Sequence, residues 1–479
     1  MDNLEDIGGK EVLGISKVEG PLLIVKGMGS VAYDEIVEVR DTRGQTRYGK
    51  VLEVAEDFAV IEVFSGTTGL SLDGTNVRFM GRSLEIPVSE EMLGRVFNSL
   101  GQPIDGFPEP LAKKMADING QVINPSARIY PEEYLQTGIS VIDCMNTLII
   151  GQKLPIFSGA GLPHDQLAAQ IVRQAQIGLS ADEDENSPEN LAKARQNFSI
   201  IFAAMGIKHD VAAFFRQEFT RSGALGRVAM FLNVADDPAI ERLLIPRAAL
   251  TLAEYLAFEC SQQVLVVMLD MTNYCEALRQ ISNKRGEVPA RKGFPGYMYS
   301  DLASLYERTG RIKKSLGAIT QIPVLTMPND DITHPIPDLS GYITEGQIVL
   351  GRNLYQQNIY PPINVLPSLS RLMKDGIGKG KTRADHPHLS SQLYALYAHV
   401  QDVRSLASVI GEDELSKIDQ QYLAFGRAFE ERFLKQDYAE NRSITQTLNI
   451  GWDLVSMLPR TELLRLSKAE LDQYYKPAA

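Results

Sequence analysis

Cysteine is scarce in this chain, and it has neither long apolar runs nor an excess of positive charge. Only three cysteines, Cys144, Cys260 and Cys275, occur in 479 residues, and none forms a C-x-x-C pair. Neither a disulfide framework nor a metal site is therefore expected, and reduced thiols are typical of a cytosolic protein. No run reaches the about 18 apolar residues of a membrane-spanning helix, and the acidic start is unlike a signal peptide. Any membrane role is expected to run through partner subunits.

The charge balance of the chain disfavours nucleic acid as a ligand. The formal net charge is −12, with 44% hydrophobic and 23% charged residues, which are ordinary values for a globular protein. General nucleic-acid binders normally present a basic surface, and the first 80 residues hold few aromatic side chains on which bases could stack. A hexameric RNA motor with an N-terminal barrel is therefore the weaker alternative, and no nucleic-acid partner is expected.

Three regions differ in pattern along the chain. Residues 1–80 contain short β-rich runs separated by turn residues, which predicts a small β-barrel. Residues 81–365 alternate apolar strand runs with helical stretches, which predicts a central α/β domain with a parallel sheet. Residues 366–479 carry apolar stripes at helical spacing from about Asp385, which predicts a helical bundle. The acidic run 182–189 predicts a solvated loop.

One turn in the central region occupies the place of a phosphate-binding loop. A strand-like run leads into Ser158, Gly159, Ala160, Gly161, Leu162, Pro163, His164 and Asp165, and a helical pattern follows. This order of strand, turn and helix is the context of the Walker A motif G-x-x-x-x-G-K-[ST], whose backbone N–H groups and lysine hold phosphate. The context therefore predicts a nucleotide-binding fold.

The residues that would hold phosphate are absent from this turn. Ser158 and Pro163 replace the two glycines, His164 replaces the lysine, and Asp165 replaces the hydroxyl residue. Pro163 has no N–H to donate, His164 is mostly neutral at pH 7, and Asp165 opposes a phosphate by about 1–4 kcal/mol. The simpler interpretation is a helix start with an Asp165 cap, worth about 1 kcal/mol. The Walker A context and the missing phosphate-binding residues together predict a degenerate P-loop.

Two strand ends bear on catalysis. The apolar run 264–269 ends on Asp270, in the form of a Walker B strand, at the sheet edge where open α/β folds bind ligands. A catalytic subunit also needs a carboxylate that orients the attacking water, and the run 203–207 ends on Lys208 instead. The pattern favours a chain that does not hydrolyse ATP alone, with a self-sufficient ATPase as the alternative.

A second glycine-rich stretch, 375–382, comes within one residue of the Walker A motif. No strand is expected directly before it, and Pro387 is expected to interrupt an immediate helix. A flexible basic connector is therefore favoured over a second P-loop.

Arg371 follows a proline-rich segment between the central and helical regions. Pro361, Pro362 and Pro367 stiffen that segment and would hold the arginine in a set direction. Most arginines are solvated or form surface ion pairs, and composition alone favours that interpretation. The alternative is an arginine finger, whose planar guanidinium stabilises charge on a γ-phosphate held by another subunit.

Long motifs occur throughout the chain, at residues 66–70, 93–95, 98, 103–106, 136–140, 153–163, 270–274, 294–299 and 334–347. In these motifs the chain resembles the B subunits of V-type and A-type rotary ATPases, nearly from end to end. The resemblance implies a RecA-like central domain and a non-catalytic, regulatory role. It also implies an alternating hexamer of three A and three B subunits around a central shaft.

The resemblance further implies where nucleotide binds. ATP or ADP with Mg²⁺ would lie at the A–B interface, with the Mg²⁺ held by the A subunit and no nucleotide bound by this chain alone. The arginine finger of the family falls on Arg371, and Ser340 and Tyr342 would face the same interface.

The remaining partners also follow from the resemblance. They are the central shaft, the peripheral stalk and an ion-transporting membrane sector, which would place the chain in a peripheral head on the cytoplasmic face. Asp413, Glu414, Leu415 and Ser416 resemble the tip that pushes on the shaft, although an acidic helix-starting turn explains them equally well locally. The sequence leaves open synthesis or pumping, and protons or sodium ions.

Overall fold

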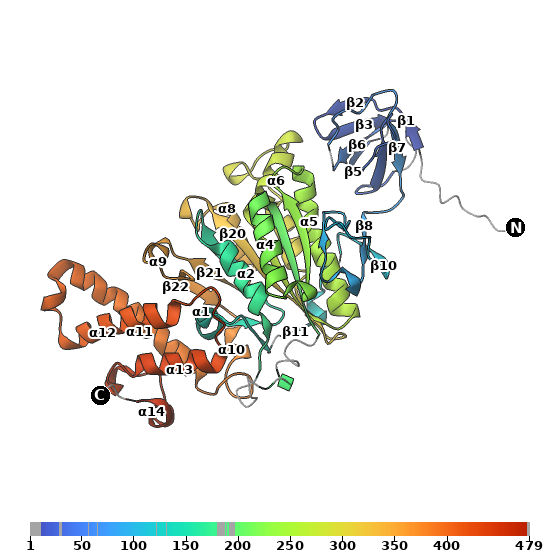
Figure 1. The fold of residues 1–479 in the computed structure, drawn as a ribbon. Coiled ribbons are helices and arrows are strands. Elements are labelled where there is room, and N and C mark those ends of the chain that lie inside the picture. The colour runs from blue at the N-terminus through green and yellow to red at the C-terminus, as the bar shows by residue number, and fades with distance from the viewer. Residues whose placement is uncertain are drawn as a thin grey trace.

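A computed structural model describes residues 11–27, 31–55, 57–64, 66–120, 122–130, 132–179, 187, 189–190 and 197–476. The acidic insertion 182–189 therefore lies almost entirely outside the described residues. A β domain, an α/β domain and a group of helices follow one another along the chain (Figure 1).

The N-terminal domain is one antiparallel sheet. Its seven strands lie in the order β1-β7-β4-β5-β6-β3-β2. Their bounds are β1 Glu11–Leu13, β2 Lys17–Glu19, β3 Leu22–Lys26, β4 Ile36–Arg40, β5 Thr46–Val54, β6 Phe58–Val63 and β7 Asn76–Phe79. Alternate residues such as Leu23, Val25, Val77 and Phe79 are buried in its own core, which is the period-2 pattern of a half-buried strand. The predicted β-barrel-type domain is confirmed.

The central domain is built on a long, mostly parallel sheet. Its strand order is β22-β21-β14-β20-β18-β16-β17-β9, and only β22 runs antiparallel to its neighbour β21 along this path. The bounds are β9 Val96–Phe97, β14 Ile156–Gly159, β16 Phe198–Ile207, β17 Val228–Val234, β18 Gln263–Leu269, β20 Ala318–Met327, β21 Gly346–Leu350 and β22 Ile363–Ser370. The predicted parallel α/β core is confirmed.

Helices cover both faces of this sheet, and alternate residues of one strand pack against helices on opposite faces. In β16, Ile200 and Phe202 pack into one apolar core with α2 (His164–Gln174) and α4 (His209–Arg221). Ile201 and Ala203 pack into the other core with α5 (Ala239–Glu254) and α6 (Met271–Lys284). Burial on both faces explains why these strands read as continuous apolar runs.

The smaller elements join these layers. They are β8 Glu85–Val88, β10 Lys114–Asp117, β11 Arg128–Ile129, β12 Tyr134–Gln136, α1 Ser140–Met145, β13 Leu148–Ile149, β15 Gln176–Ile177, α7 Met298–Tyr306, β19 Gly310–Ile312, α8 Pro335–Ile343, α9 Arg352–Gln356 and α10 Met373–Gly376. Strand β22 crosses the predicted domain limit at residue 365, and the limits themselves stay predictions.

The C-terminal region is helical, as predicted. It contains α11 His386–Ile410, α12 Lys417–Ala428, α13 Ile444–Val455 and α14 Lys468–Tyr474. The expectation that Pro387 interrupts an immediate helix is wrong, because Pro387 lies in the first turn of α11. There a missing N–H costs nothing and the fixed φ favours the helix.

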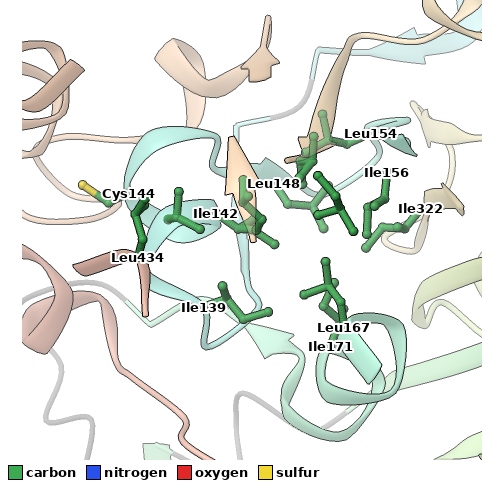
Figure 2. Packing of buried hydrophobic residues seen from close by; sticks show 14 of the residues in the cluster. Ile139, Ile142, Cys144, Leu148, Leu154, Ile156, Leu167, Ile171, Ile322 and Leu434 are labelled. Atoms are coloured by element: carbon green, nitrogen blue, oxygen red, sulfur yellow. The ribbon is translucent and has the colours of Figure 1, made fainter. Parts of the chain in front are cut away.

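An apolar core runs without a break from the central sheet to these helices. Ile156 on β14 and Ile142 on α1 belong to the same buried cluster as Leu434, which follows α12 in the chain. Figure 2 shows α1 between the sheet side chains and Leu434. The helical region is thus packed directly onto the strands that carry the candidate site.

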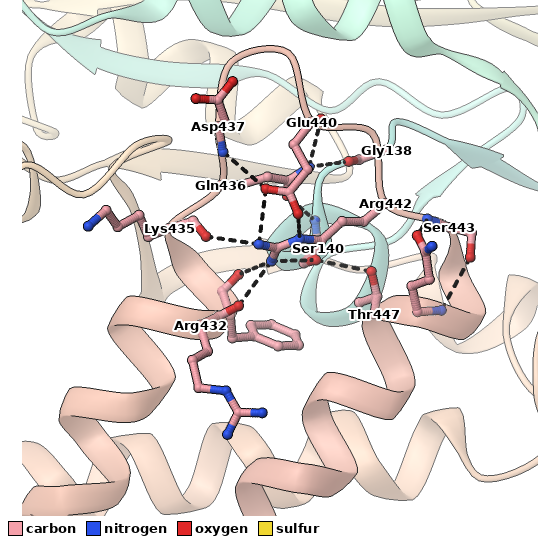
Figure 3. A network of polar contacts seen from close by, with 12 residues as sticks. Gly138, Ser140, Arg432, Lys435, Gln436, Asp437, Glu440, Arg442, Ser443 and Thr447 are labelled. Atoms are coloured by element: carbon pink, nitrogen blue, oxygen red, sulfur yellow. Dashed lines mark hydrogen bonds and ion pairs between the residues drawn. The ribbon is translucent and has the colours of Figure 1, made fainter.

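A polar network also joins α1 to the C-terminal region, at a contact that we call the seam (Figure 3). The guanidinium of Arg442 bonds Glu440, the carbonyls of Arg432 and Lys435, and Ser140 Oγ at 3.3 Å. Gln436 donates to the carbonyl of Gly138, and Ser140 Oγ lies 3.0 Å from Thr447 Oγ1. Helix α1 is therefore held to the C-terminal region by hydrogen bonds as well as by apolar contacts.

Acid should weaken this seam through His386. Its ring is fully buried between Thr382 Oγ1 (3.0 Å) and the carbonyl of Cys144 (2.9 Å). Burial is the main reason that the pKa of His386 is lowered to about 4. Above pH 6.5 the ring is neutral whether the chain is folded or not, but between pH 6.5 and 4 only the unfolded chain takes up the proton. Stability is therefore complete above pH 6.5 and falls by about 2 kcal/mol from pH 7 to pH 5.

Urea unfolding of the wild type and of His386→Gln at pH 7, 6 and 5 checks this prediction. The stability difference between the two chains should shrink, or reverse, as the pH falls. His209→Gln, at an exposed histidine, is the control and should change little with pH. A wild type and a His386→Gln variant that lose stability in parallel would contradict the prediction.

Candidate functional site

The turn after β14 is closed by its own hydrogen bonds. The N–H of Leu162 donates to Gly159 O at 3.1 Å, and the N–H of His164 donates to Leu162 O at 2.9 Å. Gly161 has a φ of +78°, a conformation that glycine adopts without strain. These N–H groups are occupied within the turn and do not point together toward a phosphate.

His164 is also turned inward. Its Nδ1 lies 3.0 Å from Ser158 Oγ and 3.0 Å from Leu162 O, and its Nε2 lies 3.6 Å from Asp165 Oδ1. The sequence interpretation of Asp165 as the helix cap is wrong, because α2 begins at His164 with Pro163 at the N-cap position. Asp165 instead lies in the first turn, where its charge favours the helix dipole.

A salt bridge fills the space beside the turn. Arg352 pairs with both carboxylate oxygens of Asp330, at 2.7 and 2.9 Å, and donates to Ala160 O at 3.0 Å. A Cβ added to Gly159 would lie 2.2 Å from Asp330 Oδ1, so a larger residue there would displace this ion pair. The ion pair therefore holds the turn in the closed shape.

Asp270 lies at the end of β18, as predicted for a Walker B carboxylate. It adopts a left-handed backbone with φ 65° and caps α6 by accepting from Asn273 N. Its Oδ2 also accepts from Asn273 Nδ2 at 2.7 Å. Burial raises the pKa of Asp270 to about 6, although His164 and Arg242 favour its charged form. Burial likewise raises the pKa of Asp165, with Asp210 adding to the effect.

These residues do not fit a bound nucleotide with Mg²⁺. The N–H groups of Leu162 and His164 are bonded within the turn, Pro163 has none, and Asp165 and Asp270 oppose phosphate. Lys208 is exposed and precedes α4 at its N-cap position, so the carboxylate expected of a catalytic subunit is not at this strand end. The degenerate P-loop is therefore a packed structural turn.

The second glycine-rich stretch is also a structural turn. Thr382 Oγ1 accepts from Gly378 N at 2.8 Å and lies 3.0 Å from the ring of His386. Strand β22 ends at Ser370, before the short helix α10, so no strand leads directly into the stretch. Its threonine is buried and occupied, which favours the connector interpretation.

Arg371 follows the last residue of β22, at the edge of the central sheet. Its backbone N–H donates to Glu345 O at 2.9 Å, and its Nη1 donates to Thr344 O at 3.4 Å. The residue is exposed, and no carboxylate in the described residues forms an ion pair with it. The backbone is thus fixed while most of the guanidinium remains free to bind an anion.

Ser340 and Tyr342 lie on α8 but differ in exposure. The side chain of Ser340 is buried, with Oγ 3.5 Å from Tyr306 Oη, and its carbonyl accepts from Thr344 Oγ1 at 2.8 Å. Tyr342 is 73% exposed. Of the two, only Tyr342 presents its side chain on the surface of the chain, and a role for either at an interface stays a prediction.

The predicted tip lies between α11 and α12. Asp413 and Glu414 are exposed in a short 3-10 turn, Leu415 is buried, and Ser416 caps α12 by accepting from Asp419 N at 3.2 Å. The geometry agrees with an acidic helix-starting turn at the end of a helical hairpin. A role in pushing on a shaft stays a prediction.

Sequence reasoning missed a polar group behind Arg371, in which two side chains are buried and one is half-buried. It consists of Gln152, Lys153 and Glu345, which connect the segment before β14 to the turn before β21. Lys153 belongs to a motif that carried the family resemblance, yet its burial could not be read from a local pattern. A lysine and a glutamine beside an apolar run were the available signal.

Metal and membrane features were sought over the described parts of the chain. There, no group of three or more His, Cys, Asp or Glu side chains is arranged to hold a metal ion. Among the helices of those same parts, none combines the length and the apolar character needed to cross a membrane.

Family models match all three regions. The nucleotide-binding domain of the ATP synthase alpha/beta family matches residues 138–370, and the beta-barrel domain of that family matches 15–81. The C-terminal domain of V and A type ATP synthase matches residues 375–475. The barrel, the α/β core and the helical region thus correspond to three known domains in the same order.

Relatives match over nearly the full length. The chain is 60% identical to the V-type ATP synthase beta chain of Halothermothrix orenii over 467 residues, covering 98% of both chains. It is 59% identical to the B subunit of the A-type ATP synthase of Aeropyrum pernix over 469 residues, again 98% of both. The solved ATP synthase subunit NeqB from Nanoarcheaum equitans aligns with a TM-score of 0.71 at 42% identity, covering 92% of this chain and 100% of that one. The chain therefore belongs to the ATP synthase alpha/beta family, among the B or beta chains of V-type and A-type ATP synthases.

Proposed function

We propose that this chain is the non-catalytic, regulatory B subunit of a V/A-type rotary ATPase and supplies Arg371 as an arginine finger in trans. One contrast carries the proposal: the P-loop turn is closed on itself, whereas Arg371 is fixed at its backbone and its exposed guanidinium makes one long hydrogen bond, to Thr344 O at 3.4 Å. A guanidinium so placed can stabilise charge on a phosphate that another subunit holds.

The catalytic A subunit is the partner that completes the site. In this proposal A holds ATP and Mg²⁺ with its own Walker motifs, and Arg371 reaches the γ-phosphate across the A–B interface. Tyr342, exposed two residues before Thr344, would line the same interface. Ser340 would act there through its carbonyl contact with Thr344.

The remaining parts of the complex follow from the same proposal. Three A and three B subunits alternate around a central shaft, which the 413–416 tip contacts, and a peripheral stalk holds the head. The head lies on the cytoplasmic face of the membrane and couples ATP hydrolysis or synthesis to proton or sodium transport. This chain reaches the membrane only through the ion-transporting sector.

Separation of the subunits tests the non-catalytic role. The purified chain alone should hydrolyse ATP at no more than the background rate, because its P-loop turn offers no phosphate site. Addition of the A subunit should restore turnover in the assembled complex, with an A subunit lacking its Walker lysine as the control. Enzyme-like ATP hydrolysis by the isolated chain would overturn the proposal, and so would an RNA shift at low salt without any A-dependent activity.

A further inference from the structure

The backbone that carries Arg371 depends on a two-residue turn. Arg371 donates its N–H to Glu345 O at 2.9 Å and its Nη1 to Thr344 O at 3.4 Å. Both acceptors lie between α8 and β21, 26 or more residues away along the chain. The direction of the guanidinium therefore follows the position of the Thr344–Glu345 turn.

Buried side chains of the segment before β14 hold that turn. The N–H of Lys153 donates to Glu345 Oε2 at 2.8 Å, and the N–H of Glu345 donates to Lys153 O at 3.1 Å. Lys153 Nζ, on a side chain only 3% exposed, pairs with Glu345 Oε1 at 2.7 Å. Glu345 is thus fixed by backbone and side-chain contacts from a single neighbour.

Gln152 ties the turn to the end of β22. Its Nε2 donates to Glu345 O at 3.2 Å and to Ser370 Oγ at 2.9 Å, while Ser370 Oγ donates to Thr147 O at 3.0 Å. Glu345 O therefore accepts from both Gln152 and Arg371. One fully buried glutamine bonds the residue before Arg371 and the carbonyl that receives the Arg371 N–H.

The buried ammonium of Lys153 lies between two half-buried carboxylates. Lys153 Nζ also approaches Glu307 Oε1 at 3.3 Å, and Glu307 pairs with Arg128 at 2.7 Å. Positive and negative groups alternate along the row, so the buried lysine is paired on both sides. Buried pairs that are satisfied in this way hold one geometry, whereas removal of one partner leaves an uncompensated charge.

We infer that Gln152, Lys153 and Glu345 are positioning residues, a brace that sets the direction of Arg371 toward the interfacial nucleotide. This inference rests on the proposed function of Arg371. Gln152 and Lys153 are buried and Glu345 is half-buried, and in this inference the three residues act on the nucleotide through Arg371. A small displacement of a reacting or charge-stabilising group can cost about 100-fold in rate.

A double-mutant cycle in the reconstituted A–B complex tests the inference. Gln152→Met keeps the side-chain volume and removes the donor, and it should lower kcat about 10- to 100-fold with little change in KM. In an Arg371→Ala background the same change should lower kcat less than about twofold, because the group it positions is gone. Gln392→Met, at a buried glutamine of α11 that bonds Glu462 O and the N–H of Arg465, is the matched control and should leave kcat unchanged.

Lys153 provides a second route if Gln152→Met is poorly folded. Lys153→Met should act like Gln152→Met, and Lys153→Arg should recover most of the rate because it keeps the charge. Hydrogen exchange of the complex gives a readout apart from activity: amides of residues 344–346 and 370–372 should exchange faster in Gln152→Met and Lys153→Met but not in Gln392→Met.

The outcomes of these experiments distinguish failure of the brace from failure of the proposed arginine finger. Equal losses of kcat in both backgrounds, or an unchanged kcat in Gln152→Met while Arg371→Ala is inactive, would overturn the brace and leave the finger intact. Normal turnover of Arg371→Ala itself would overturn the proposed function, and the brace with it.

Discussion

Replacing Arg371 with lysine is expected to lower kcat of the reconstituted A–B complex by at least about 100-fold. Lysine keeps the positive charge but loses the planar fork that binds two phosphate oxygens at once. Arginine fingers contribute about 10³- to 10⁵-fold to the rate in other phosphoryl-transfer systems. Because the finger acts on charge that develops in the transition state, KM should change much less than kcat.

Steady-state ATP hydrolysis and an assembly measurement together check this expectation. Size-exclusion chromatography should show an intact complex for Arg371→Lys, since the backbone bond to Glu345 does not involve the side chain. Arg82→Lys, at a surface arginine paired with Glu85 at 2.6 Å, is the control for a lost guanidinium and should leave kcat unchanged. Near-normal turnover of Arg371→Lys would make Arg371 a structural arginine and move the role of the subunit to assembly and torque transmission.

Replacing Arg308 with methionine is expected to destabilise the chain by about 3–5 kcal/mol, because it leaves a partly buried carboxylate without its partner. The Arg308 side chain is fully buried and its Nε donates to Glu254 Oε1 at 2.6 Å. Its other nitrogens donate to Ile118 O at 3.1 Å and Thr251 Oγ1 at 2.8 Å. The guanidinium thereby ties helix α5 to the segment that follows β10.

Urea unfolding at pH 7 measures this loss. The double variant Arg308→Met/Glu254→Gln should recover part of the stability, because no unpaired charge then remains. Arg40→Met, at an exposed pair with Glu38, should cost less than about 1 kcal/mol. An equal shift for Arg308→Met and Arg40→Met would show that the buried network contributes nothing beyond a surface pair.

The local pattern of apolar and polar residues was enough to predict the architecture of the chain. Alternating residues gave the strands of the first domain, and apolar runs gave strands such as β16 and β18, because burial on one or both faces leaves a direct trace in the sequence. The degenerate P-loop could also be read locally, since Pro163, His164 and Asp165 are the wrong residue types for phosphate wherever their side chains point.

Predictions about the direction of a single side chain were less secure. Asp165 has the composition of a helix cap, yet α2 begins one residue before it. Ser340 lies in a motif that suggested an interface, yet its hydroxyl is buried beside Tyr306. Pro387 looked like a helix breaker and instead lies in the first turn of α11. A shift of one residue along a helix turns a side chain by about 100°, which periodicity does not resolve.

The residues alone were enough to predict three successive domains, a turn without the residue types of a phosphate site and an arginine behind a stiff segment. Each of these features depends only on residues that are neighbours in the sequence, so it does not depend on how the rest of the chain folds. The support of Arg371 was decided only in three dimensions, because Gln152 bonds Ser370 from 218 residues away and Glu345 O receives the Arg371 N–H once the strands pair. Their polar side chains are stable inside the protein only where those distant partners satisfy them.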